Sequence, residues 1–136
     1  MNIRTTAIVG LGALGIMFGH QMNKSLPAGV LKVIADEKRI DRYKNGGVYC
    51  NGELCDFDYV TPEQAEPADL VLVAVKQPGL AEAMDAMAGA VGENTVILSL
   101  LNGIASETIL AERFGAEKVL ACVAQGMDAV REGQSV

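Results

Sequence analysis

The chain of 136 residues is long enough for one domain with a sizeable buried core. Half of its residues are apolar and 21% are charged, a composition that is typical of globular proteins and excludes a disordered chain. The net charge of -6 at pH 7 argues against a nucleic-acid partner, because no basic stripe is available to displace counterions, whereas an anionic small molecule needs only local positive charge.

Cysteine and histidine are too few to indicate a metal site. Cys50, Cys55 and Cys122 show no metal-ligand grouping and the chain has one histidine, so we expect reduced thiols and no bound metal. No apolar run reaches the length that spans a membrane, and the first residues lead directly into a strand without room for a signal peptide. We therefore expect a soluble, cytoplasmic protein with no membrane partner.

A glycine loop follows the first predicted strand, residues 3–9, and opens a predicted helix over residues 13–25. In the pattern Gly-x-Gly-x-x-Gly, the first glycine allows a tight turn and the second leaves space for a pyrophosphate. The third glycine lets the helix pack close to the strand, and the amides at the helix start face the anion. The pattern therefore predicts dinucleotide binding by Gly10, Leu11, Gly12, Ala13, Leu14 and Gly15.

The single histidine lies on this first helix. His20 is more than one turn beyond the phosphate end, so we assign it a structural or surface role rather than a catalytic one.

A second strand over residues 30–35 ends at Asp36, about 20 residues after the glycine loop. A carboxylate at this place accepts hydrogen bonds from the adenosine ribose hydroxyls and repels a 2′-phosphate, so Asp36 alone favours NAD over NADP. Asp36 is equally suited to be the N-cap of a helix over residues 37–45, and the two roles can coexist. Lys38 and Arg39 either clamp a 2′-phosphate or form a solvated helix face.

The next segment predicts a small antiparallel excursion. Residues 45–47 are predicted as a turn and residues 48–50 as a short strand. Asn51-Gly52 is a strong hairpin signal that sends the chain back through residues 54–59. We assign the acidic residues of this excursion to its solvent-exposed side; they are Glu53, Asp56 and Asp58.

Strands and helices then alternate to the end of the chain. After a polar loop, residues 70–75 form a continuous apolar, β-branched run that is typical of a strand buried on both faces. Further strands are predicted over residues 95–100 and 118–124, with a helix over residues 106–114 between them. The helix that follows residue 79 presents one apolar face, formed by Leu80, Ala83, Met84, Met87 and Val91.

This alternation predicts an α/β fold with a Rossmann-type, doubly wound and mainly parallel sheet. Ligands bind such sheets beyond the carboxyl ends of the strands, where the strand order reverses. Lys76 follows one apolar strand and Asn102 follows the next, so both should border a crevice with the glycine loop. Lys76 is either a group that holds substrate or polarises its oxygen, or a surface lysine. Asn102 is either a turn residue or an amide that binds ribose, nicotinamide or substrate.

Three segments together resemble a known family. The segments Gly10-Leu11-Gly12-Ala13-Leu14-Gly15, Val75-Lys76-Gln77 and Leu101-Asn102-Gly103-Ile104 are similar to the N-terminal domain of ketopantoate reductases, the 2-dehydropantoate 2-reductases. The glycine loop is generic, whereas a lysine after one strand with Asn-Gly after the next is more specific. The resemblance implies an oxidoreductase that reduces 2-dehydropantoate to pantoate with NADPH in pantothenate biosynthesis.

The resemblance also implies roles and missing parts. Lys76 and Asn102 would be catalytic residues next to the nicotinamide and a small-molecule 2-oxo acid. The family has a helical C-terminal domain for substrate binding and dimerisation, which supplies a general-acid lysine and is absent from residues 1–136. We therefore expect a dinucleotide-binding fragment that is inactive alone, and a homodimer for the whole protein.

Cofactor choice and two other functions stay open at this point. The family commonly has a basic residue where this chain has Asp36, so NADP(H) by resemblance stands against NAD(H) by the carboxylate. One alternative is another two-domain NAD(P)-dependent 2-oxo or hydroxy acid dehydrogenase. The other is a non-catalytic module that senses a dinucleotide, in which Lys76→Ala would change binding without any effect on hydride transfer.

Overall fold

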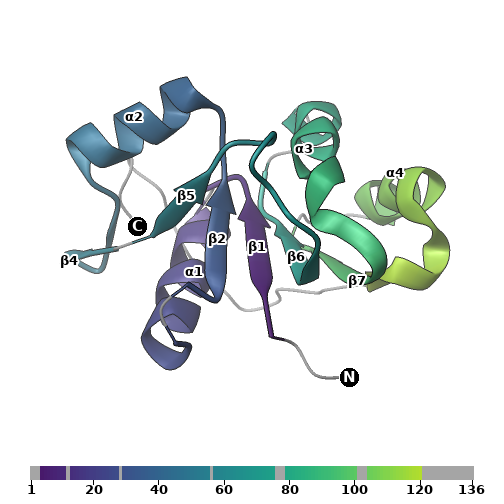
Figure 1. Ribbon diagram of the computed structural model, residues 1–136, viewed down its shortest axis with the longest axis horizontal. Helices are drawn as coiled ribbons and strands as arrows, with labels where there is room; N and C mark the ends of the chain where they lie inside the picture. The colour runs from purple at the N-terminus through teal and green to yellow at the C-terminus, as the bar shows by residue number, and fades with distance from the viewer. Residues whose placement is uncertain are drawn as a thin grey trace.

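The computed structural model describes residues 4–11, 13–27, 29–55, 57–75, 79–100 and 104–120, with the backbone alone at residues 13, 14 and 104–106. A central sheet lies between helices, and a small hairpin lies beside it (Figure 1). In chain order the elements are β1 (Thr6–Val9), α1 (Ala13–Ser25), β2 (Leu31–Ile34), α2 (Glu37–Gly46), β3 (Tyr49–Cys50), β4 (Glu53–Leu54), β5 (Asp58–Val60), β6 (Ala68–Val73), α3 (Leu80–Met87), the 3-10 turn η2 (Ala88–Ala90), β7 (Val91–Ser99), α4 (Ile104–Phe114), the 3-10 turn η3 (Ala116–Lys118) and β8 (Val119–Leu120).

The strand order of the central sheet is β5-β2-β1-β6-β7-β8, and every pairing within it is parallel. Parallel neighbours need crossover connections, and α1, α3 and α4 supply them between strands that are adjacent in the sheet. The predicted Rossmann-type, doubly wound sheet is confirmed.

Apolar side chains cover both faces of this sheet. On one face Ile8 of β1 packs in a cluster with Ile16 of α1 and Tyr43 of α2. On the other face a second cluster contains Met87 of α3 and Leu110 of α4, both fully buried. The continuous apolar run of β6 fits this arrangement, because a strand between two helical layers is buried on both sides.

The segment Asp58–Val60 differs from its prediction. It was expected to belong to the antiparallel excursion, but it forms β5 and pairs in parallel with β2 at the edge of the central sheet. The Lys32 ammonium group of β2 forms an ion pair with the Asp58 carboxylate across this edge. The hairpin itself is confirmed over β3 and β4, with the positive φ angles of a type I′ turn at Asn51 (51°) and Gly52 (81°).

Several predicted boundaries are also wrong, including the starts of β6 at Ala68 and β7 at Val91 instead of residues 70 and 95. The first strand begins at Thr6 rather than at residue 3. The predicted turn over residues 45–47 lies largely within α2, which ends at Gly46; Gly47 is its C-cap, where φ is 75° and the N–H donates to the Tyr43 carbonyl oxygen. Val91 does not extend the apolar face of α3, because η2 redirects the chain and Val91 is the first residue of β7.

The predicted strand over residues 118–124 is described only as Val119–Leu120, and Cys122 lies outside the described residues. Within the ranges given above, no helix is both long enough and apolar enough to cross a bilayer.

Candidate functional site

Neighbouring strands end at one edge of the sheet. Val9 at the end of β1 is in register with Ile34 of β2 on one side and with Val73 of β6 on the other. Beyond the strands, the Ala74 N–H donates to the Val9 carbonyl (3.0 Å), and the Leu100 N–H donates to the Val73 carbonyl (2.8 Å). The segments that follow these strands therefore start from the same level of the sheet.

The strand order reverses between β1 and β6. From β1 the chain proceeds to β2 and β5 on one side, and it returns through β6 to continue with β7 and β8 on the other. The connections leave β1 and β6 in opposite directions, and in open parallel sheets a ligand crevice is expected beyond the carboxyl ends of two such strands. The glycine loop follows β1 at this point, and Ala74 and Val75 follow β6.

Gly10 lies directly against the end of β6. Its φ is +86°, which disfavours any residue with a side chain, and a Cβ on it would lie 2.3 Å from Val75 Cγ1. The same Cβ would lie 3.2 Å from the Ala74 carbonyl carbon and oxygen. Only glycine therefore allows the loop to turn this close to the neighbouring strand.

Gly15 brings the first turn of α1 equally close. A Cβ on Gly15 would lie 2.7 Å from Ala74 Cβ and 2.8 Å from the Gly10 carbonyl oxygen. The first and third glycines of the motif thus occupy the positions that a phosphate-binding loop requires, and α1 begins at Ala13, directly after the loop. The first amides of a helix have no partner within the helix and are suited to bind an anion. These residues fit a pyrophosphate group.

The other predicted loop residues are less fully described. Gly12 lies outside the described residues, and at Ala13 and Leu14 the structure describes only helical backbone. The Leu11 side chain is buried in the core, so a contact of this residue with a ligand would come from its backbone.

Asp36 stands at the end of β2 and is the N-cap of α2. Its Oδ1 accepts a hydrogen bond from the Arg39 backbone N–H at 2.8 Å, so the predicted capping role is confirmed. The side chain is half exposed, and a carboxylate has about four lone-pair sites, so this cap leaves acceptor capacity for ligand hydroxyls.

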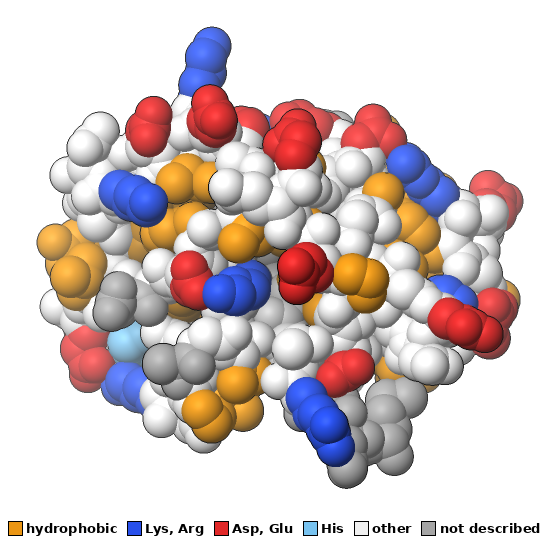
Figure 2. All heavy atoms as spheres, in the orientation of Figure 1, with side chains coloured by type: hydrophobic (Ala, Val, Ile, Leu, Met, Phe, Trp, Pro, Cys, Tyr) orange, Lys and Arg blue, Asp and Glu red, His pale blue; other side chains and the backbone are white. Residues whose placement is uncertain are grey.

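Arg39 lies between two carboxylates. Its Nη1 is 3.7 Å from Asp36 Oδ2 and 3.5 Å from Oε1 of Glu82, in the first turn of α3. The Lys38 side chain is exposed and forms no hydrogen bond or ion pair with the described residues. Figure 2 shows acidic side chains along the upper edge, above α2 and α3, with Lys or Arg side chains among them. Glu82 was not singled out by the sequence, because nothing local to it marks a contact with α2.

Lys76 and Asn102 lie outside the described residues, and their site roles stay predictions. Residues that the structure describes near them in the chain do lie close to the glycine loop or to β6. Val75, which precedes Lys76, is the residue that a Cβ on Gly10 would strike. Leu100, two positions before Asn102, is hydrogen-bonded to the end of β6.

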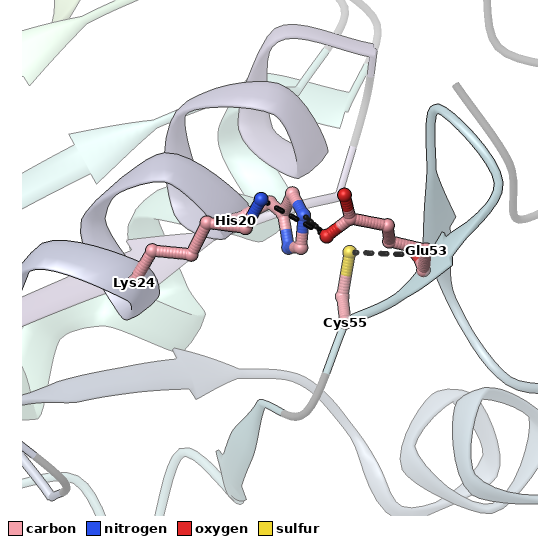
Figure 3. A network of polar contacts seen from close by, with 4 residues as sticks. All are labelled: His20, Lys24, Glu53 and Cys55. Atoms are coloured by element: carbon pink, nitrogen blue, oxygen red, sulfur yellow. Dashed lines mark hydrogen bonds and ion pairs between the residues drawn. The ribbon is translucent and has the colours of Figure 1, made fainter.

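His20 lies away from this crevice, in a polar network between α1 and the hairpin (Figure 3). Its Nε2 is 3.3 Å from Glu53 Oε2, and Lys24 Nζ is 2.9 Å from the same oxygen. The hydrogen bond and charge of Lys24, followed by the hydrogen bond of His20, hold the pKa of Glu53 below its ordinary value of 4.5. This placement agrees with a structural role for His20.

Glu53→Gln is expected to lower the melting temperature at pH 7, because the amide loses the charge that Lys24 attracts. A carboxyl whose pKa is lowered on folding stabilises the native state above its unfolded pKa, and the effect is lost as the pH falls through the folded pKa. The difference in melting temperature between wild type and variant should therefore be smaller at about pH 3 than at pH 7. Calorimetry at both pH values measures it, and an equal difference at both would contradict this role.

The two described cysteines belong to the same region. Cys50 and Cys55 are buried and form no disulfide. Burial raises the pKa of the Cys55 thiol to about 11, with smaller contributions from Cys50 and Glu53. A thiol of this kind stays protonated at neutral pH and is a packing residue rather than a nucleophile. No three potential metal ligands cluster within the described part of the chain.

The chain matches known proteins over almost its whole length. The family model for ketopantoate reductase PanE/ApbA matches residues 6–136. A 2-dehydropantoate 2-reductase of Streptococcus pyogenes serotype M3 is 28% identical over 117 residues, which cover 83% of this chain and 38% of that protein.

Solved structures have the same fold. The 2-dehydropantoate 2-reductase from Geobacter metallireducens GS-15 is 30% identical with a TM-score of 0.77, and the match covers 96% of this chain and 44% of that one. A D-mandelate dehydrogenase, solved with NADH and anilino(oxo)acetate, is 23% identical with a TM-score of 0.77 over the same shares. The chain thus spans less than half the length of these relatives.

Proposed function

Because this chain belongs to the ketopantoate reductase PanE/ApbA family, we propose that it is the cofactor-binding part of an oxidoreductase that reduces a 2-oxo acid with a nicotinamide dinucleotide. The observation that carries the proposal is the close approach of Gly10 to Ala74 and Val75. Through this contact the glycine loop lies next to Val75, the residue before Lys76, at the place where the strand order of the sheet reverses. The substrate proposed first is 2-dehydropantoate, for which the relatives are named.

Several described residues support a binding site for such a cofactor. The amides of the first turn of α1 bind the pyrophosphate, and the missing Cβ of Gly10 lets the backbone turn beneath it. Asp36 accepts hydrogen bonds from the adenosine ribose hydroxyls while it caps α2. Lys76 and Asn102, which follow β6 and β7 in the chain, would bind the nicotinamide end of the cofactor.

The reduction needs a hydride at the 2-oxo carbon and a proton at its oxygen. A bound reduced nicotinamide supplies the hydride. The Lys76 ammonium group donates a hydrogen bond to the carbonyl oxygen and stabilises the negative charge that builds up on it. The Asn102 amide orients the substrate or the nicotinamide, and the resemblance assigns the proton donor to a lysine of the C-terminal domain.

Titration of the full-length protein with NADH and NADPH separately, followed by addition of 2-dehydropantoate and other 2-oxo acids, tests this function. We expect saturable binding of at least one dinucleotide and substrate-dependent oxidation of it, with a kcat of about 1–1000 per second. Loss of nicotinamide absorbance and formation of the 2-hydroxy acid are the measurements.

Two results would overturn the proposal in different ways. Absence of dinucleotide binding would remove the cofactor role itself. Binding without oxidation by any 2-oxo acid would favour a sensing module instead of an enzyme.

A further inference from the structure

One guanidinium group connects the two helices that border the proposed cofactor crevice. Arg39 of α2 has Asp36 Oδ2 at 3.7 Å and Glu82 Oε1 at 3.5 Å. Both helices lie at the carboxyl end of the sheet, where α2 follows β2 and α3 comes after β6 (Figure 1). The group therefore lies where the adenosine ribose of a dinucleotide is expected, next to the acceptor Asp36.

The charges of this trio favour a ribose without a phosphate. Two carboxylates surround one guanidinium, so the trio carries one net negative charge, and a 2′-phosphate would be repelled by both acids. Arg39 is the cation best suited to hold that phosphate, but it would have to leave Glu82 to do so. All three side chains are substantially exposed, so these ion pairs contribute little to stability. Their main effect is on the electrostatic potential at the expected ribose position.

We propose that Glu82 is a positioning residue for cofactor specificity, which engages Arg39 in an ion pair, keeps it from a 2′-phosphate and so selects NAD(H) over NADP(H). The inference rests on the proposed dinucleotide site. Glu82 belongs to no sequence motif. In this arrangement Asp36 does not determine cofactor specificity by itself. Glu82 acts through Arg39, so removal of its charge should change the preference between the two cofactors rather than the binding of both.

The test compares full-length wild type with Glu82→Gln, and Asp85→Asn is the matched control. Asp85 is on the same helix and is exposed, but its carboxylate pairs with Arg113 of α4 at 2.6 Å instead of with α2. Dissociation constants for NADH and NADPH are measured by titration calorimetry, with the melting temperature as a check on folding. The ratio of the two constants is the decisive quantity, because a purely structural role of Glu82 would not change it.

Wild type should bind NADH about tenfold or more tightly than NADPH. Glu82→Gln should tighten NADPH binding about three- to tenfold and leave NADH binding within about twofold, because a carboxylate near the phosphate is removed and Arg39 is released. Asp85→Asn should leave the ratio unchanged.

A wild type that prefers NADPH would overturn the inference and leave the proposed function intact. The same holds if Glu82→Gln leaves the ratio at its wild-type value, or if Asp85→Asn shifts it as much. If neither dinucleotide binds to wild type, the proposed function fails and this inference fails with it.

Discussion

Replacing Gly10 with alanine is expected to lower the free energy of unfolding by about 2–5 kcal/mol and to abolish dinucleotide binding. The added Cβ would lie 2.3 Å from Val75 Cγ1 and 3.2 Å from the Ala74 carbonyl, and the residue would keep an unfavourable φ of +86°. Relief of this overlap has to move the loop away from β6, which displaces the start of α1 from the pyrophosphate position. Denaturant unfolding and dinucleotide titration of the full-length variant measure the two effects.

Gly29→Ala is the matched control, because Gly29 has the same φ of +86° but nothing within 4 Å of an added Cβ. It should cost only the backbone strain, about 1–2 kcal/mol, and leave dinucleotide binding unchanged. The difference between the two variants therefore measures the contact with β6. Equal losses of stability would mean that the overlap with Val75 adds nothing to the cost of the backbone strain at Gly10.

Local signals in the sequence predicted most of the fold. The helix over residues 13–25 was found with the predicted bounds, because a glycine loop starts it and a proline-containing turn follows it. The hairpin at Asn51-Gly52 was found because these two residues readily adopt the positive φ angles of its turn. Each signal lies within a few neighbouring residues.

The topological error occurred where the partner of a segment is remote, and another error occurred where one spacing pattern fits both helix and strand. The residues of β5 were assigned to the neighbouring hairpin, but their partner is β2, and alternation of side chains does not reveal which strand a segment joins. Val91 continues the apolar spacing of α3, and the buried side of the sheet demands an apolar residue there too, so the pattern could not distinguish helix from strand.

In the candidate site, too, local features could be predicted and contacts between remote segments could not. The roles of Gly10 and Asp36 in the loop and the helix cap follow from motifs within a few residues of each other, and the structure bears out their local geometry. The contact of Arg39 with Glu82 joins two helices that are separated by four strands in the chain. A single sequence carries no signal for such a pair, so only the folded chain reveals that the cation is already bound to two acids.

Replacing Lys76 with alanine is expected to reduce kcat for the 2-oxo acid about 100- to 1000-fold in the full-length protein, with a change in dinucleotide affinity of less than about threefold. The reason is that the proposed hydrogen bond from Lys76 strengthens as negative charge develops on the substrate oxygen, whereas the cofactor is held mainly by the glycine loop and Asp36. Single-turnover kinetics and dinucleotide titration measure the two quantities separately.

Lys44→Ala is the control for the loss of one positive charge. Lys44 is an exposed residue in the last turn of α2, at the opposite end of the helix from Asp36, so its removal should leave both quantities unchanged. If Lys76→Ala instead weakens dinucleotide binding and leaves kcat at the wild-type value, the lysine is a cofactor ligand only. Charge stabilisation at the reacting carbonyl would then have to come from another group, such as the Asn102 amide or the lysine that the resemblance assigns to the C-terminal domain.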